Sequence, residues 1–143
     1  MEREEFLKTL GIGLALVCTG SCFQACKKND DSEPGGGADT TVSVDIASMA
    51  TIGSQTTSNG VLFFRTGAES QASSFVATEA LCPHQGGTLT WLSGSSKIQC
   101  GTHASAYTNT GSVISQPSDG GTTRALKIYA VTLSGTTLTA TKS

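Results

Sequence analysis

The chain has 143 residues, and its formal net charge at pH 7 is only −2. A charge this close to zero leaves no basic footprint for nucleic acid, so we expect no nucleic-acid partner. It also predicts no strong electrostatic steering toward a charged partner. Only 14% of the residues are charged, and the chain has five cysteines and two histidines. The cysteines and histidines are therefore the most informative residues about function.

Residues 1–25 have the pattern of an export signal. The apolar run at residues 10–17 is too short to span a bilayer comfortably, and small residues follow it. This layout is typical of a signal peptide rather than of a transmembrane helix. The sequence therefore predicts that the mature protein lies outside the cytoplasm.

The end of this segment, from Phe23 to Cys26, resembles a bacterial lipoprotein signal, in which the cysteine becomes the lipidated first residue. The resemblance implies lipidation at Cys26 and an anchor in a membrane of the bacterial cell envelope, with Cys22 as the alternative. Residues 3–8 resemble the twin-arginine export motif, with Glu4 in place of the second arginine. The general secretory route and the twin-arginine route both stay open.

Residues 26–40 are expected to form a flexible tether. They contain several charges, one proline and three consecutive glycines, but no large apolar residue. Such a composition behaves as a random coil, and about fourteen residues of it span roughly 20 Å. The sequence predicts that the tether connects a lipid anchor to a domain at residues 41–143.

The segment at 41–143 has the pattern of a small all-β domain. Apolar and polar residues alternate at 41–46, and compact strands are expected at 61–65, 74–78 and 97–99. Residues 126–133 and 136–141 flank Ser134 and Gly135, which predicts a β-hairpin. No long 3.6-residue period follows residue 40. We therefore expect an antiparallel β-sandwich with a small subdomain of two inserted loops.

Two short motifs contain both histidines and two of the five cysteines: Cys82-Pro-His84 and Cys100-Gly-Thr-His103. Two thiolates and two imidazoles at this spacing predict a four-ligand metal site. A disulfide between the two cysteines would leave the histidines unexplained. Zinc accepts the same ligands, but zinc fingers usually pair Cys with Cys and His with His. The mixed order favours a two-iron cluster, with the cysteines on one iron and the histidines on the other.

The two motifs, together with their flanking residues, resemble the Rieske [2Fe-2S] family. The resemblance extends from about residue 41 to the C-terminus. It implies a Rieske-type antiparallel β-sandwich with a small cluster-binding subdomain of two loops. It also implies one [2Fe-2S] cluster, with Cys82 and Cys100 on the inner iron and His84 and His103 on the outer, solvent-facing iron.

Residues beside the ligands are expected to tune this cluster. Gly86 and Gly87 allow close approach of backbone N–H groups to the bridging sulfides. Ser105 and Tyr107 stand at the offsets from the second histidine at which high-potential members of the family donate hydrogen bonds to sulfur. The resemblance therefore implies that Ser105 and Tyr107 raise the potential.

One difference separates the chain from the Rieske proteins of quinol-oxidising complexes. Those proteins carry an extra cysteine in each loop, and the two form a disulfide that braces the cluster. The corresponding positions here are Gly87 and Thr102. Since no such disulfide can form, the chain resembles a Rieske-type ferredoxin more closely.

The resemblance implies one-electron transfer between redox protein partners, without catalysis by the chain itself. One alternative is an electron-transfer subunit of a larger oxidoreductase, of the dioxygenase or oxidase type. Another is a structural zinc-binding module. A terminal oxygenase would need two further histidines for a mononuclear iron, and the chain has none left.

Overall fold

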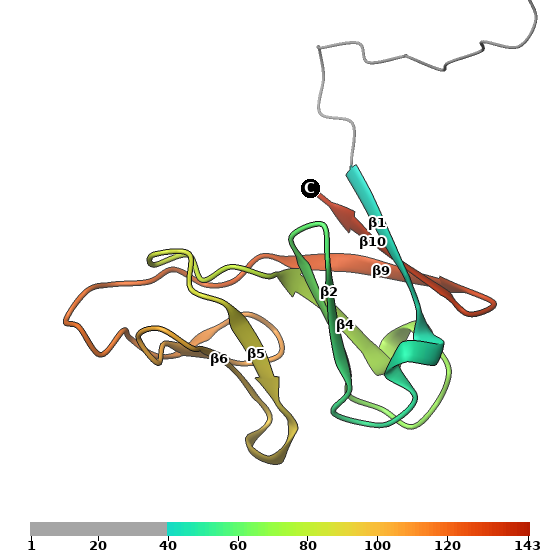
Figure 1. Cartoon of the computed structure of the whole chain (residues 1–143), viewed down its shortest axis with the longest axis horizontal. Helices are drawn as coiled ribbons and strands as arrows, with labels where there is room; N and C mark the ends of the chain where they lie inside the picture. The colour runs from blue at the N-terminus through green and yellow to red at the C-terminus, as the bar shows by residue number, and fades with distance from the viewer. Residues whose placement is uncertain (1–39) are drawn as a thin grey trace, which may run out of the picture. The chain divides into compact units, whose positions relative to one another are not determined.

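The computed structural model describes residues 40–143 of the chain (Figure 1). The expected export signal, the lipidation at Cys26 or Cys22, and residues 26–39 of the expected tether lie outside the described residues. The described part consists of antiparallel strands and three short 3-10 helices. No helix between residues 40 and 143 is long and apolar enough to cross a membrane.

The larger sheet has six strands and contains both chain ends of the described domain (Figure 1). Their order across the sheet is β1 (Thr40–Asp45), β10 (Thr137–Lys142), β9 (Ile128–Ser134), β4 (Phe75–Glu79), β3 (Val61–Arg65) and β2 (Gln55–Ser58). Only two residue pairs join β4 to β9. The sheet therefore consists of two three-stranded halves joined by a short pairing.

The two halves pack face to face over one hydrophobic core. Val42, Leu138 and Ala140 come from the β1–β10 half, and Phe63, Phe75 and Ala77 come from the β3–β4 half. The helix η1 (Ile46–Met49) adds its two apolar residues at the edge. This confirms the all-β, antiparallel fold that the sequence predicts.

The observed strands lie close to the expected ones. The strand at 61–65 has the expected bounds, and β9 begins two residues later than expected, at Ile128. The turn of the predicted hairpin is present, with Gly135 at φ +59°, in the left-handed region that favours glycine. Strand β2 and three short strands of the smaller sheet were not predicted, because each has only two to four residues, too few to establish an alternation.

The smaller sheet carries the candidate centre. Its strands, in order, are β5 (Leu89–Leu92), β6 (Lys97–Cys100), β7 (Ala106–Tyr107) and β8 (Val113–Ser115). The helices η2 (Ala72–Ser74) and η3 (Ser93–Ser95) lie at strand connections. β5 and β6 pair antiparallel, with Leu89 opposite Cys100. This pairing brings the start of one ligand segment beside the end of the other.

Strand β3 connects the two sheets by being buried on both faces. Its residues Val61 and Phe63 belong to the sandwich core, whereas Leu62 and Phe64 belong to a second core under the smaller sheet. Phe64 stacks on Trp91 of β5, with ring centroids 4.4 Å apart and an interplanar angle of 16°. The uninterrupted apolar run of β3 is explained by this double burial.

Candidate metal centre

The first ligand loop, residues 81–88, connects β4 to β5. The Cys82 N–H donates to Gly87 O at 2.7 Å, and the Gly86 N–H donates to Cys82 O at 2.8 Å. Gly86 has φ +73°, a conformation that costs glycine little. These two bonds close a tight turn that contains His84. The Gly86 N–H is used inside the turn. The close approach of other backbone N–H groups to bridging sulfides stays a prediction.

The second ligand loop, residues 100–105, repeats the backbone pattern of the first. The Cys100 N–H donates to Ser105 O at 2.8 Å, and the Ala104 N–H donates to Cys100 O at 3.2 Å. Ala104 has φ +58° at the position that corresponds to Gly86. An L-residue is strained in this region, so glycine would adopt this conformation at lower cost. Each loop therefore presents its cysteine and its histidine from a similar turn.

Cys82 and Cys100 lie on the inner side of the two loops. Both are free, buried thiols, each with 3% of its surface exposed, and no disulfide joins them. Burial pushes the pKa of Cys82 upward, but hydrogen bonds from Tyr107, the His84 backbone and Cys100 outweigh it, so the pKa lies below its ordinary value. A lowered thiol pKa favours the thiolate, which is the form that binds metal.

The hydroxyl of Tyr107 points at the first cysteine. Tyr107 Oη lies 3.2 Å from Cys82 Sγ and 2.7 Å from Thr123 Oγ1. Burial, and then the neighbouring Cys82, raise the pKa of Tyr107 to about 12. The phenol therefore stays protonated at neutral pH and can donate to a thiolate.

Two observations indicate that the residues present fit a sulfur-containing cluster. Ser105 is fully buried beside Cys82 and Tyr107, yet its Oγ makes no hydrogen bond of good geometry among the described residues. A buried hydroxyl without an acceptor is costly, and a bridging sulfide would supply one. At Gly87, a Cβ would lie 2.6 Å from Cys100 Sγ and 2.5 Å from Thr102 Oγ1. Glycine at this position therefore keeps space open beside the second cysteine.

His84 and His103 lie on the outer side of the centre. Their rings meet edge to face, with centroids 5.2 Å apart. The His84 side chain is 10% exposed and that of His103 is 23% exposed, so both reach the surface while the cysteines do not. The structure thus separates the four candidate ligands into a buried sulfur side and an accessible nitrogen side.

A third segment covers the histidines, and the sequence analysis did not identify it. This cover loop, residues 116–124, is joined to the second ligand loop by a bond from the Ser118 N–H to His103 O at 2.8 Å. Asp119 Oδ2 lies 2.9 Å from His84 Nε2 and 3.6 Å from His103 Nε2. His84 Nδ1 lies 3.0 Å from Thr122 O. His84, His103 and Asp119 thus place three possible ligand atoms within 4.8 Å of one another.

The cover loop also changes the charge properties of the first histidine. The hydrogen bond to Asp119 raises the pKa of His84, burial works against this, and the Thr122 carbonyl adds to the increase. The same hydrogen bond lowers the pKa of Asp119, with help from the Gly121 N–H. The carboxylate is therefore ionised beside the imidazoles at neutral pH.

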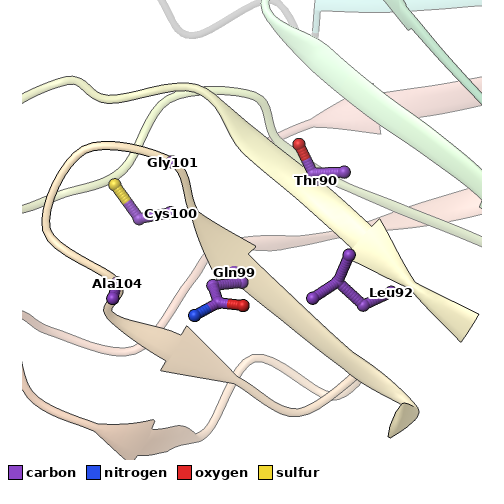
Figure 2. A pocket seen from close by; sticks show the side chains of 6 residues that line it. All are labelled: Thr90, Leu92, Gln99, Cys100, Gly101 and Ala104. Carbon is purple, nitrogen blue, oxygen red and sulfur yellow. The ribbon is translucent and has the colours of Figure 1, made fainter. Parts of the chain in front are cut away.

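A pocket lies over β5 and β6, next to the second ligand loop (Figure 2). Six residues line it: Thr90, Leu92, Gln99, Cys100, Gly101 and Ala104. Cys100 borders the pocket, but the two histidines are not among its lining residues. The pocket is therefore a neighbouring surface feature and not the space between the four candidate ligands.

Two solved structures are similar to this chain. The crystal structure of the cyanobacterial plasma membrane Rieske protein PetC3 from Synechocystis PCC 6803 is 24% identical, with a TM-score of 0.47, covering 62% of this chain and 84% of that one. The ferredoxin of carbazole 1,9a-dioxygenase from Nocardioides aromaticivorans IC177 is 20% identical, with a TM-score of 0.56, covering 73% of this chain and 99% of that one. The similarity to the ferredoxin, with a TM-score of 0.56, supports the all-β fold.

The family to which the chain belongs follows from the sequence match. No curated protein is similar enough in sequence to count as a relative. Residues 41–130, well over half of the chain, match the family described as Rieske [2Fe-2S] domain. The match includes both ligand loops and the cover loop. The chain is therefore a member of the Rieske [2Fe-2S] family, whose domain binds a [2Fe-2S] cluster and transfers electrons through it.

Proposed function

We propose that the chain is a one-electron carrier whose [2Fe-2S] cluster is held by Cys82 and Cys100 on one iron and by His84 and His103 on the other. The separation of the four side chains supports this assignment. Both thiols are buried, and both imidazoles reach the surface of the described domain. Soft thiolates suit iron–sulfur clusters, and imidazoles complete the Rieske type.

The residues of the chain have separate roles in this proposal. The cluster, when bound, takes up and releases one electron. The two turns hold a cysteine and a histidine each, and the double burial of β3 fixes the turns to the rest of the domain. Tyr107 and Ser105 offer hydroxyl donors on the buried side. A redox partner would exchange electrons at the histidine edge, because that is the accessible side.

The ligand assignment is tested by metal content and spectroscopy. We expect the purified protein to contain two irons and two sulfides per chain, and to give an electron paramagnetic resonance (EPR) signal only after reduction. His84→Ala should lose the cluster, whereas the neighbouring variant Gln85→Ala should keep it. A colourless protein with one bound zinc would contradict the proposal and favour the structural zinc module.

We further propose that the carrier is anchored by a lipid on Cys26 at a membrane of the bacterial cell envelope. The sequence pattern of residues 1–25 and the Phe23–Cys26 resemblance support this proposal. We expect Cys26→Ser to move the protein from the membrane fraction to the soluble fraction, with Cys22→Ser as the matched control. The opposite result for the two variants would place the lipid on Cys22.

The second candidate function is an electron-transfer subunit of a larger oxidoreductase. The likeness in fold to a dioxygenase ferredoxin is the reason to test it. Mild detergent extraction and affinity purification of the full chain should yield the protein alone if it is a free carrier. Purification with a larger enzyme in fixed stoichiometry would favour the subunit.

A further inference from the structure

Asp119 is the acidic side chain, within residues 40–143, that reaches both histidines of the centre. A single oxygen atom, Oδ2, lies 2.9 Å from His84 Nε2 and 3.6 Å from His103 Nε2. The carboxylate is about one third exposed, at 32%. One negative charge is thus shared between the two imidazoles at the accessible edge of the centre.

We propose that Asp119 is a positioning residue that fixes both imidazole rings and lowers the reduction potential of the cluster. This inference rests on the proposed function, in which the two histidines bind iron. A ligating histidine gives one ring nitrogen to the metal and usually donates the other N–H to a carboxylate or carbonyl. Since both Nε2 atoms face Asp119, the Nδ1 atoms would be the ones to hold iron. At His84, iron would then replace the Nδ1 contact to Thr122 O.

The backbone of the cover loop fixes the position of this carboxylate. Asp119 Oδ1 accepts a hydrogen bond from the Gly121 N–H at 3.0 Å, so the side chain is tied to its own turn. A Cβ at Gly121 would collide with the His84 ring. The Ser118 N–H donates to His103 O at 2.8 Å, which holds the loop to the other histidine. The part of the loop from Ser118 to Gly121 is therefore fitted against both histidines.

The charge of Asp119 acts against the hydroxyl donors on the other side of the centre. Adding an electron makes the cluster more negative, and a nearby negative charge makes this less favourable. Hydrogen bonds from Ser105 and Tyr107 would have the opposite effect. Two opposing groups would thus set the reduction potential. The hydroxyl donors on the buried sulfur side raise it, and the carboxylate on the exposed nitrogen side lowers it.

The test is the midpoint potential of the cluster-loaded Asp119→Asn variant. If its Oδ1 keeps the bond to the Gly121 N–H, asparagine removes the charge and also places a donor NH2 group where Oδ2 faced the two Nε2 atoms. Asp45→Asn is the matched control, because Asp45 Oδ1 also accepts from the N–H two residues ahead, in Ala47, at 2.8 Å. We expect Asp119→Asn to raise the equilibrium constant for reduction about tenfold, or about 59 mV for one electron, and Asp45→Asn to leave it unchanged.

Two further readouts report on position and charge. The difference between Asp119→Asn and the wild type should shrink as salt is added, because the carboxylate is partly exposed to solvent. The nitrogen hyperfine couplings of isotope-labelled histidine should change in Asp119→Asn and stay unchanged in Asp45→Asn. A purely structural loop residue would not produce a salt-dependent difference in potential.

Several results would overturn the inference while leaving the proposed function intact. An unchanged or lowered potential in cluster-loaded Asp119→Asn would do so. If Asp119→Asn does not take up the cluster, Asp119→Ser carries the same expectation of a raised potential. Loss of the cluster in both variants would show that Asp119 is needed for assembly rather than for tuning. A wild-type protein without iron and sulfide would instead refute the proposed function.

Discussion

Replacing Tyr107 by phenylalanine removes one hydroxyl from the buried side of the centre and leaves the ring in place. Tyr107 is fully buried, and its Oη lies 3.2 Å from Cys82 Sγ. A thiolate sulfur can only accept, so the phenol donates this bond. The Thr123 hydroxyl, 2.7 Å away, then donates to Tyr107 in preference to Arg124 O, which lies 3.5 Å from it. We expect Tyr107→Phe to lower the midpoint potential.

The size of the shift follows from the value of one hydrogen bond. The bond is stronger in the reduced state, because the sulfur ligands then carry more negative charge. If the difference between the two states equals one net hydrogen bond, it is about 1 kcal/mol. A tenfold change in equilibrium constant corresponds to about 59 mV for one electron, so the potential should fall by about 40 mV.

The assay is a spectroelectrochemical titration of the cluster-loaded proteins at neutral pH. Tyr129→Phe is the matched control, since Tyr129 lies on β9 in the larger sheet. Thr123→Val should give a smaller decrease than Tyr107→Phe, because it weakens the same chain of hydrogen bonds indirectly. An unchanged potential in Tyr107→Phe, or an equal decrease in Tyr129→Phe, would refute the reasoning.

Three further predictions concern the two turns and the buried phenol. Both Gly86 and Ala104 have positive φ, so alanine is strained at either position. In thermal or denaturant unfolding, Gly86→Ala should lower the free energy of unfolding by about 1 kcal/mol. Ala104→Gly should leave it unchanged or raise it. Gly87→Ala would place a methyl carbon 2.6 Å from the thiol sulfur of the second ligand loop, so we expect reduced cluster content, measured as iron and sulfide. Gly94→Ala, in open space, is its control. Folding raises the pKa of Tyr107 from 10 to about 12, so the protonated phenol contributes to the free energy of unfolding. This contribution is complete below pH 10 and is lost as the pH rises through 12. The decline in stability should be weaker in Tyr107→Phe.

The sequence predicted the strands whose own residues show an apolar pattern. Residues 40–45 alternate because one face of β1 is buried, and Val42 lies in the core. The run at 61–65 was also found, but its sequence does not reveal why both faces are apolar. That reason is the second core under the smaller sheet, which depends on packing between distant segments.

The four candidate ligands were predictable, whereas the cover loop was not. Cys82 and His84, like their counterparts in the second motif, combine rare residue types at short spacing, which makes them visible in one sequence. Asp119 is an ordinary acidic residue in a polar loop, and its partner His84 is 35 residues away in the chain. Only the fold brings them together. A single sequence contains no local signal for such a contact.

Strand β3 has a mechanical consequence for electron transfer. Since Leu62 and Phe64 are packed under the two ligand loops while Val61 and Phe63 are packed in the sandwich, neither part can rotate without breaking a core. The stack of Phe64 on Trp91 strengthens this junction. To serve a donor and an acceptor at different places, the domain would therefore have to move between them as one body.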